Sequence, residues 1–457
     1  MVVILGAGLA GLSAAYHLSD RDYVLIERES EVGGLCRSQR HDGFVFDFTG
    51  HLLHLRDPSI RDWVLKLLPD GYRQLHRSAW IHSHDTLTPY PFQANTAGLP
   101  LEVRLECLLG FIAAMSHQTA ERQGIPEPQP LIDGLPFMTV CPPPRAGEPN
   151  FLDWIMSTFG EGFAKHFFIP YNEKLWRRKL SAVTGDWVSW SIPRPELADV
   201  LRGAITRSGK VYGYNPQFLY PAAGGIDHLP RSLAAHIPEN SMRLECAAVE
   251  ISAAKRRVTL ANGETLTGEF ILSSLPLTVL AKITTDMPYD LKAAAADLDH
   301  VSIRAVNLGV RGEPVHADAQ WVYFPEASAP FHRIGLPTAL TPTMAPSGHH
   351  SLVAEISFRP EDDPGPEASL EQTVSSLLRC GFLRSRDDIV TSKVVDIPLA
   401  YVVFDKRRRE VLPELMRWFV QNGIVPMGRY GTWDYLAMED SLRHGREVAA
   451  WIGSQTV

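Results

Sequence analysis

The first eighteen residues constrain the fold more than any other part of the chain. Residues 2–5 are a short apolar run, which is typical of a parallel strand buried on both faces. Three glycines follow, Gly6, Gly8 and Gly11, and then the helix-like residues 12–18. In such a turn the first glycine permits the bend, the second lets backbone N–H groups approach a phosphate, and the third allows close helix packing. The helix N-terminus would also favour the negative charge of the phosphate.

A second apolar run, residues 23–26, ends in an acid, Glu27. A carboxylate at the tip of this strand can accept hydrogen bonds from ribose hydroxyls. Glycine-rich turns are common, so the glycine spacing alone would be weak evidence. Strand, glycine turn, helix and acid in this order are the full context of a dinucleotide site, and the sequence therefore predicts one.

Composition excludes several classes of protein. Lys and Arg total 44 against 52 Asp and Glu, and a net charge of −8 does not favour non-specific nucleic-acid binding. Five scattered cysteines without a CxxC pair exclude a disulfide framework and a cysteine zinc site, and no metal site is predicted. The longest strongly apolar stretch, residues 108–115, is too short to span a membrane. We therefore expect a cytoplasmic protein.

A second glycine pair, Gly33 and Gly34, lies just beyond Glu27, and a Gly50-His51 step follows residues 47–49. This pattern resembles the large FAD-dependent family that includes amine oxidases, phytoene desaturases, protoporphyrinogen oxidase and UDP-galactopyranose mutase. The resemblance implies non-covalently bound FAD. The residues expected to contact it are Gly6, Gly8, Gly11, Glu27, Gly33, Gly34, Gly50, Arg77, Val249 and Gly428.

We expect an α/β fold with a discontinuous Rossmann-like FAD-binding domain, a helical insertion and an antiparallel sheet domain. The expected boundaries are residues 1–75, 205–285 and 424–457 for the FAD domain, 95–204 for the helical domain, and 76–94 with 286–423 for the sheet domain. Within the first of these, Asn262-Gly263 predicts a two-residue hairpin turn. Residues 125–149 contain eight prolines and should be loop or extended, and Asn150 is a plausible N-cap for the helix after it.

Further segments resemble UDP-galactopyranose mutases, especially their eukaryotic-type branch. They are residues 89–95, residues 150–154 with 168–176, residues 321–326 with Arg333, and residues 428–438. With the FAD pattern, the resemblance is spread over nearly the whole chain. It implies a nucleotide-sugar substrate.

By position, the resemblance assigns roles to side chains. The uridine would be surrounded by Tyr90, Phe92, Gln93, Asn150 and Trp154. The diphosphate would be held by Arg333, Tyr401 and Tyr435, with Arg429 at the flavin end. Tyr171, Asn172, Arg194, Trp321 and Tyr323 are also expected to contact substrate, the last two by lining the sugar pocket. His51 would lie against the reactive edge of the flavin, which makes His51, Arg333, Tyr435 and Arg429 the candidate catalytic residues.

Each assignment has a structural alternative. Trp154 at helical spacing is otherwise a core tryptophan, Tyr90 a strand edge, and His51 a satisfied structural histidine. The sequence also departs from the mutase pattern at Ile169, Arg194, His54 and Ala437. These departures lie near the expected sugar and phosphate more than near the uridine.

In the mutases, N5 of the reduced flavin attacks the anomeric carbon and expels the nucleoside diphosphate. The sugar ring opens and recloses through another hydroxyl before the diphosphate returns. The resemblance implies the same reaction here, with an external reductant such as NAD(P)H. Two alternatives stay open: an amine oxidase or desaturase of the same fold, and a non-catalytic flavin- or nucleotide-binding subunit. The sequence does not reveal the sugar or the oligomeric state.

Overall fold

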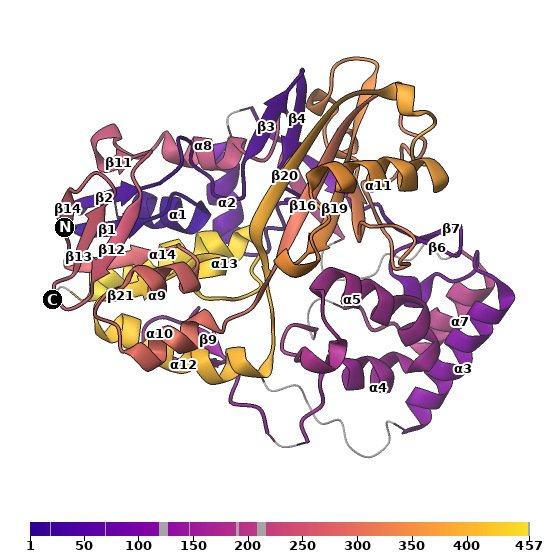
Figure 1. Ribbon diagram of the computed structural model, residues 1–457, viewed down its shortest axis with the longest axis horizontal. Coiled ribbons are helices and arrows are strands. Elements are labelled where there is room, and N and C mark those ends of the chain that lie inside the picture. The colour runs from indigo at the N-terminus through magenta and orange to yellow at the C-terminus, as the bar shows by residue number, and fades with distance from the viewer. Residues whose placement is uncertain are drawn as a thin grey trace.

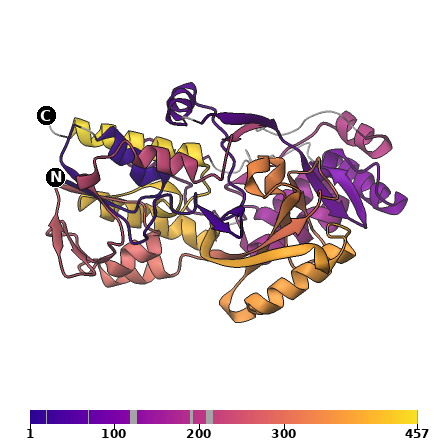
Figure 2. The same cartoon turned by 90° about the horizontal axis from the view of Figure 1, so that it is seen from above.

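The computed structural model describes residues 1–18, 20–68, 70–117, 127–145, 147–188, 192–207 and 216–455. Figure 1 shows an α/β part that holds both ends of the chain, a large sheet beside it, and a group of helices next to that sheet. Seen from above, the α/β part and the helical group lie at opposite ends of the molecule (Figure 2).

Five short parallel strands form the centre of the α/β part. In spatial order they are β11 (Met242–Arg243), β2 (Tyr23–Ile26), β1 (Val2–Leu5), β15 (Phe270–Ser273) and β21 (Ile424–Pro426). β1, β2 and β21 are buried at every position, as expected for a parallel sheet covered on both faces. The start, middle and end of the chain thus meet in one sheet.

Helix α1 (Leu9–His17) follows the glycine turn and packs closely against α14 (Met438–Ser454). A Cβ added at Gly445 would lie 2.4 Å from the carbonyl oxygen of Ala10. The two backbones therefore approach each other at a position that only glycine can occupy. This contact holds the last helix of the chain beside the first.

The large sheet has seven strands. Their spatial order is β20 (Ile389–Val402), β16 (His300–Arg311), β19 (His349–Phe358), β18 (Arg333–Gly335), β17 (Trp321–Tyr323), β6 (Ala79–Ser83) and β7 (Thr86–Pro89). Neighbouring strands are antiparallel except for β17 and β6, which are parallel. A parallel pair needs a long connection, and these two strands are far apart in the sequence.

The helical group contains α3 (Leu101–His117), α4 (Phe151–Phe163), a π-helical turn (Ala164–Phe168), α5 (Ile169–Trp176) and α7 (Leu197–Ile205). α3 and α4 touch through their backbones, since a Cβ added at Gly160 would lie 2.0 Å from the Gly110 oxygen. Asn150 is the N-cap of α4, as predicted, and its side chain accepts from the Asp153 N–H at 3.0 Å.

The other helices and strands surround these parts. They are β3 (Ser38–His41), β4 (Phe44–Asp47), α2 (Pro58–Leu67), β5 (Tyr72–His76), β8 (Gln129–Pro130), β9 (Thr139–Val140), β10 (Gln217–Pro221), α8 (His228–Ala234), β12 (Ala248–Ser252), β13 (Arg257–Leu260), β14 (Thr265–Thr267), α9 (Leu277–Ile283), α10 (Tyr289–Ala296), α11 (Pro366–Arg379), α12 (Lys406–Gln421) and α13 (Gly428–Gly431).

The hairpin of β13 and β14 forms, but the predicted two-residue turn is wrong. The Leu260 N–H donates to the Glu264 carbonyl at 2.9 Å, so three residues lie between the paired positions. The Gly263 N–H donates to the Leu260 carbonyl at 2.9 Å, and Gly263 has φ +87°. A tight turn closed by a glycine in the left-handed region is the usual three-residue solution.

A parallel sheet with covering helices and a separate, largely antiparallel sheet confirm the predicted mixed α/β fold class. No helix within the described ranges is long and apolar enough to cross a lipid bilayer.

Candidate functional site

The N-terminal glycine turn is packed on one side and open on the other. A Cβ at Gly11 would lie 1.9 Å from the Gly6 oxygen, whereas a Cβ at Gly8 would meet no atom within 4 Å. Gly6 has φ +93°, a backbone conformation that favours glycine. An open backbone at the start of α1 fits the approach of a pyrophosphate.

The second glycine pair lies against this turn. The Gly33 N–H donates to the Ala7 carbonyl at 2.8 Å, and a Cβ at Gly34 would lie 3.4 Å from the Gly8 Cα. Glu27 is 8% exposed, and its Oε2 accepts from the Ala7 N–H at 2.8 Å. The predicted dinucleotide residues of the first 34 positions are therefore adjacent, which fits a dinucleotide cofactor.

Two cofactor residues predicted from later segments also approach this region. A Cβ at Gly428 would lie 2.8 Å from the Cβ of Ala10, so the start of α13 contacts α1. Val249 is exposed on β12. It follows Cys246, whose N–H donates to the Glu27 carbonyl at 2.7 Å, by three residues.

His51 is held in its neutral form. Its Nδ1 lies 3.2 Å from the Thr49 carbonyl oxygen, and since a carbonyl only accepts, this bond places the proton on Nδ1. Burial lowers the His51 pKa most, the hydrogen bond with Thr49 opposes this, and the charges of Arg429 and Arg333 add to the decrease, which brings the pKa to about 4. The predicted catalytic histidine therefore lies within the electrostatic influence of two guanidinium groups and adds no charge of its own at neutral pH.

Arg333 is engaged by a carboxylate. In the β18–β19 pairing Arg333 lies opposite Glu355, and its Nη2 is 2.7 Å from both Glu355 carboxylate oxygens. Nε donates to Oε1 at 3.1 Å. The Glu355 side chain is 2% exposed and that of Arg333 is 20% exposed. The predicted diphosphate ligand thus belongs to a bidentate ion pair, and its charge is already compensated.

Sequence reasoning does not single out Glu355. The sequence feature that could have identified Glu355 is an acid within the apolar run of β19. A carboxylate in a buried strand requires a cationic or hydrogen-bonding partner. His332 is close as well, with Nε2 3.7 Å from the Glu355 carboxylate. Burial, together with Arg333 and Lys174, lowers the His332 pKa well below its ordinary value, so Arg333 is the charged partner.

Within the part of the chain that the structure describes, Arg429 has no such carboxylate partner. Its Nη1 donates to the Leu436 carbonyl at 3.0 Å, and its buried Nε makes no hydrogen bond. The guanidinium carbon lies 4.4 Å from the ring centre of Tyr435, 5.5 Å from that of Tyr401 and 5.9 Å from that of Tyr430. Among the described residues, no carboxylate forms an ion pair with Arg429.

The Tyr401 and Tyr435 rings stack at 6.1 Å with an angle of 18°. Burial raises the pKa of Tyr401, so its phenol keeps its proton and remains a hydrogen-bond donor. The structure therefore brings together Arg429, Tyr401 and Tyr435, three of the four residues predicted for the diphosphate and the flavin end.

A chain of aromatic rings connects the sheet to the helical group. The ring centre of Tyr323 on β17 lies 5.4 Å from that of Tyr171 on α5 and 5.6 Å from that of Tyr90, which follows β7. The guanidinium of Arg77 covers the Tyr90 ring at 4.9 Å. Three residues predicted for substrate and one for cofactor are thus neighbours.

Lys174 fixes the position of α5 relative to the sheet. Its Nζ donates to the carbonyls of Phe324 at 2.8 Å, Ala329 at 3.1 Å and Phe331 at 3.3 Å, and also to that of Glu326. The acceptors belong to the loop between β17 and β18. The lysine of the mutase-like segment therefore holds Tyr171 against Tyr323.

Several residues predicted to surround the uridine are closed off in this conformation. Phe92 has no exposed surface and stacks on Phe167 at 5.0 Å. Gln93 is 2% exposed and donates from Nε2 to the Pro193 carbonyl at 2.6 Å, while Trp154 is 9% exposed. The structure places these three side chains in the core of the helical group, where they have almost no surface left for a base.

Two other residues predicted to contact substrate use their side chains for hydrogen bonds within the helical group. The Asn150 side chain caps α4, and Asn172 donates from Nδ2 to the Phe168 carbonyl at 2.8 Å. Arg194 lies exposed in the segment before α7. Trp321 lines a small cavity of about 50 Å³ with Gly50, Arg333 and Glu355.

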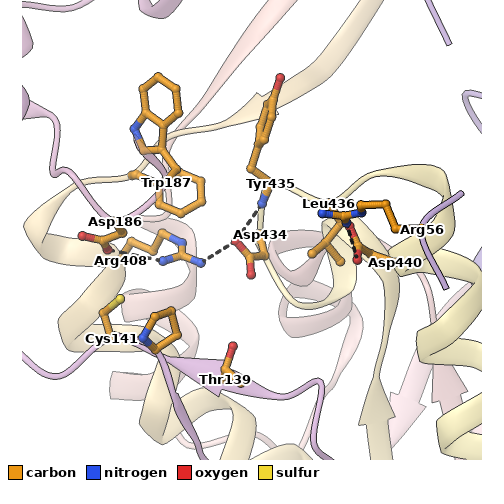
Figure 3. A pocket seen from close by; sticks show the side chains of 12 residues that line it. Arg56, Thr139, Cys141, Asp186, Trp187, Arg408, Asp434, Tyr435, Leu436 and Asp440 are labelled. Carbon is orange, nitrogen blue, oxygen red and sulfur yellow. Dashed lines mark hydrogen bonds and ion pairs between the residues drawn. The ribbon is translucent and has the colours of Figure 1, made fainter. Parts of the chain in front are cut away.

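A larger cavity of about 240 Å³ lies beside Tyr435 (Figure 3). Tyr435 and Trp187 lie on one side of it, and Thr139 and Cys141 on the opposite side. Arg408 lies between Asp186 and Asp434, with nitrogen–oxygen distances of 3.9 and 3.4 Å. The lining carries three aspartates and two arginines, so its charge is nearly balanced.

A sequence profile of flavin-containing amine oxidoreductases matches residues 9–450. The chain belongs to this family. The crystal structure of a reduced UDP-galactopyranose mutase is 26% identical, with a TM-score of 0.88, over 100% of this chain and 94% of that one.

More distant structures of the same fold include oxidases. A putative protoporphyrinogen oxidase from Exiguobacterium sp. 255-15 is 16% identical with a TM-score of 0.71, covering 100% of this chain and 99% of its own. Cyclohexylamine oxidase from Brevibacterium oxydans IH-35A is 16% identical with a TM-score of 0.68, covering 99% and 98%. A stretch of 72 residues is 33% identical to an uncharacterised protein in the nifH2 3′ region of Methanothermococcus thermolithotrophicus, over 16% of this chain and 67% of that protein.

Proposed function

We propose that this flavin-family protein is an FAD-dependent nucleotide-sugar mutase that interconverts the pyranose and furanose forms of a sugar carried on UDP. The observation that carries the proposal is the gathering of Arg429, Tyr401 and Tyr435, with Arg333 acting on the same neutral His51. Guanidinium and phenol donors suit a diphosphate, and an apolar substrate would gain nothing from them. The similarity to a mutase over the full length of the chain supports the same reaction.

The residues have separate tasks in this proposal. Reduced FAD would supply a nucleophilic nitrogen, N5, for the anomeric carbon of the sugar. Tyr401 and Tyr435 would donate phenolic hydrogen bonds to the departing diphosphate and hold it until it returns. Arg333 would present Nη1, the nitrogen that makes no hydrogen bond to Glu355. His51 would accept a hydrogen bond through Nε2, the ring nitrogen without a proton.

Base and sugar recognition would rest on different residues. Tyr90, with Arg77 over its ring, is half-buried, whereas Phe92, Gln93 and Trp154 are buried. If Phe92, Gln93 and Trp154 also touch the base, the helical group must open around them. We expect free UDP to compete with substrate better than GDP or dTDP. Since a site loses affinity steeply when a buried hydroxyl is unpaired, Arg194 should shift the preferred sugar away from galactose.

The test is a panel of nucleotide-sugar pyranoses and furanoses incubated with dithionite-reduced enzyme and separated by chromatography. Interconversion by the reduced enzyme, and none by the oxidised enzyme in air without reductant, is the expected result. Equal turnover in both redox states would contradict nucleophilic N5. No turnover of any nucleotide sugar, with UDP binding retained, would favour a non-catalytic subunit. Efficient turnover of UDP-galactofuranose, comparable with the best sugar, would show that the substitution at Arg194 is silent.

The family match and the oxidase-like structures favour one rival, oxidation of an amine or another reduced substrate. Such an enzyme would form hydrogen peroxide stoichiometrically with product under air. Peroxide release with an amine panel, and none of the sugar interconversion, would replace the mutase by an oxidase.

A further inference from the structure

The ammonium group of Lys174 occupies a cage of backbone oxygens. From α5, its Nζ donates to four carbonyl oxygens of the loop between β17 and β18. They belong to Phe324 at 2.8 Å, Ala329 at 3.1 Å, Phe331 at 3.3 Å and Glu326. An ammonium has three N–H donors, so four acceptors share them. Converging carbonyl oxygens are also ligands that proteins use for small cations, and Lys174 thus serves this carbonyl cage as a built-in cation.

Lys174 keeps its charge at neutral pH. Burial lowers its pKa to about 8, and the charge of Glu326 opposes this decrease. A charged amine removed from water is costly unless other acceptors replace the water, and the carbonyl cage supplies them. The cage in turn depends on the lysine, because its oxygens lose a charged donor when the side chain is removed.

The caged loop joins two strands that carry predicted substrate residues. Tyr323 directly precedes Phe324, and Arg333 lies two residues beyond Phe331. Arg333 is also fixed by Glu355, so the loop should matter most for Tyr323.

The lysine also positions a predicted substrate residue on its own helix. Residues three apart share one face of a helix, and Tyr171 is three residues before Lys174. The ring of Tyr171 meets that of Tyr323 at 5.4 Å with an angle of 82°. One ammonium therefore holds α5 and the loop together where these two rings meet.

We infer that Lys174 is a positioning residue of the proposed substrate site and a determinant of how tightly the sugar is held. By fixing the loop it sets the distance between Tyr171 and Tyr323, and small displacements of such supporting residues weaken a site strongly. The lysine itself need not touch the substrate. This inference rests on the nucleotide-sugar binding of the proposed function.

The experiment removes the ammonium and supplies it again from solution. Oxidised holoenzyme is titrated with UDP, UDP-glucose and UDP-galactose while flavin fluorescence is followed, so no turnover is needed. Lys174→Ala should weaken binding of the tighter UDP-sugar about tenfold, as expected for loss of a charge-assisted contact. Affinity for free UDP should change less than about threefold, since Arg333, Tyr401 and Tyr435 remain.

Methylammonium provides three N–H donors and should restore most of the lost affinity in a saturable manner. Tetramethylammonium has the same charge but no N–H group, and it should not. Hydrogen exchange of the loop amides in ligand-free holoenzyme gives a second measurement. Exchange should be about tenfold faster in Lys174→Ala and should slow again with methylammonium.

The matched control is Lys179→Ala. The Lys179 side chain is 81% exposed and pairs with Glu173 at 2.9 Å, so its removal deletes a lysine near the same helix without touching the carbonyl cage. Its affinities should stay within about twofold of the wild type, with or without methylammonium. If Lys174→Ala is isolated without flavin, Lys174→Ser is measured in its place.

Two results would overturn the inference. Wild-type affinity for the tighter UDP-sugar in Lys174→Ala would show that the lysine does not position the site. A loss that methylammonium does not restore would assign Lys174 a general structural role. Absence of UDP-sugar binding in the wild type would contradict the proposed function, whereas UDP-sugar binding that is independent of Lys174 would contradict this inference alone.

Discussion

Arg333 and Arg429 act on one histidine from different parts of the chain, and their surroundings are opposite. Arg333 stands on a strand of the large sheet and is clasped by Glu355 on the next strand. Arg429 stands in the short helix α13, among tyrosine rings and without a carboxylate among the described residues. The charge of Arg333 is compensated by a carboxylate within the protein, whereas the charge of Arg429 is available to a bound ligand. The comparison shows that two arginines predicted for one site can have different physical roles.

The strongest test of this comparison is the stability of the apoprotein. Arg333→Met leaves Glu355 buried without its cation and should lower the free energy of unfolding by about 3 kcal/mol. Arg429→Met strands no carboxylate and should change it by less than about 1 kcal/mol. Urea unfolding of flavin-free protein measures both. Equal losses of stability would show that Arg429 also has a charged partner within the protein.

Loss of Arg333 should also lower catalytic efficiency, by a free-energy equivalent similar to the loss of stability. Arg333→Ala removes a charge-assisted phosphate contact, and kcat/KM should decrease at least ~100-fold, equivalent to about 2–3 kcal/mol. FAD content should stay normal, because Arg333 lies outside the glycine motifs. Steady-state kinetics on reduced enzyme, with flavin absorbance as the control, checks this. A fully active variant would remove Arg333 from the diphosphate site.

The burial of His51, together with the charges of the two arginines, also predicts how stability depends on pH. His51 has a pKa of about 4 in the folded protein, below the ordinary value of 6.5, so between these values the unfolded chain binds the extra proton. Stability should therefore be lost as the pH falls from 6.5 to 4. His51→Asn should reduce this slope by up to about 1.4 kcal/mol per pH unit. Unfolding at several pH values measures it. An unchanged slope would mean that His51 does not contribute.

The smallest expected effect separates two tyrosines that both contact Arg429. Tyr435→Phe removes a donor assigned to the diphosphate and should weaken UDP binding about five- to tenfold, or about 1 kcal/mol. Tyr430→Phe is the control, since the Tyr430 hydroxyl donates to the Ala400 carbonyl at 3.0 Å. Its UDP affinity should be unchanged. Fluorescence titration of the holoenzyme distinguishes them, and equal losses would contradict the assignment of Tyr435.

Local sequence predicted the glycine turn after β1 well. Gly6, Gly8 and Gly11 lie where their spacing requires, because turn geometry and close helix packing depend on a few consecutive residues. The hairpin at Asn262-Gly263 was also predictable, but the length of its turn was not. The turn length depends on which residues form the last hydrogen-bonded pair of β13 and β14, and the strand pairing around the hairpin decides this.

The predicted substrate residues show where motif reasoning ends. Tyr90, Tyr171 and Tyr323 come from three segments and meet as expected of one site. Phe92 and Gln93 belong to the same motif as Tyr90, and the fold buries both in the helical core. A motif gives the order of side chains but not which of them point towards a cavity, since that depends on what packs against them.

By itself, the sequence determined the mixed α/β fold class, the glycine turn with its acid, and which segments carry arginines and tyrosines. These features follow from local periodicity and from residues with special backbone freedom. Only the tertiary structure decided that Glu355 neutralises Arg333 and that no carboxylate of the described ranges pairs with Arg429. Charge compensation is a property of distance in space. Strand pairing brings Glu355 within 2.7 Å of Arg333, and no local pattern around Arg429 could show that a corresponding acid is missing.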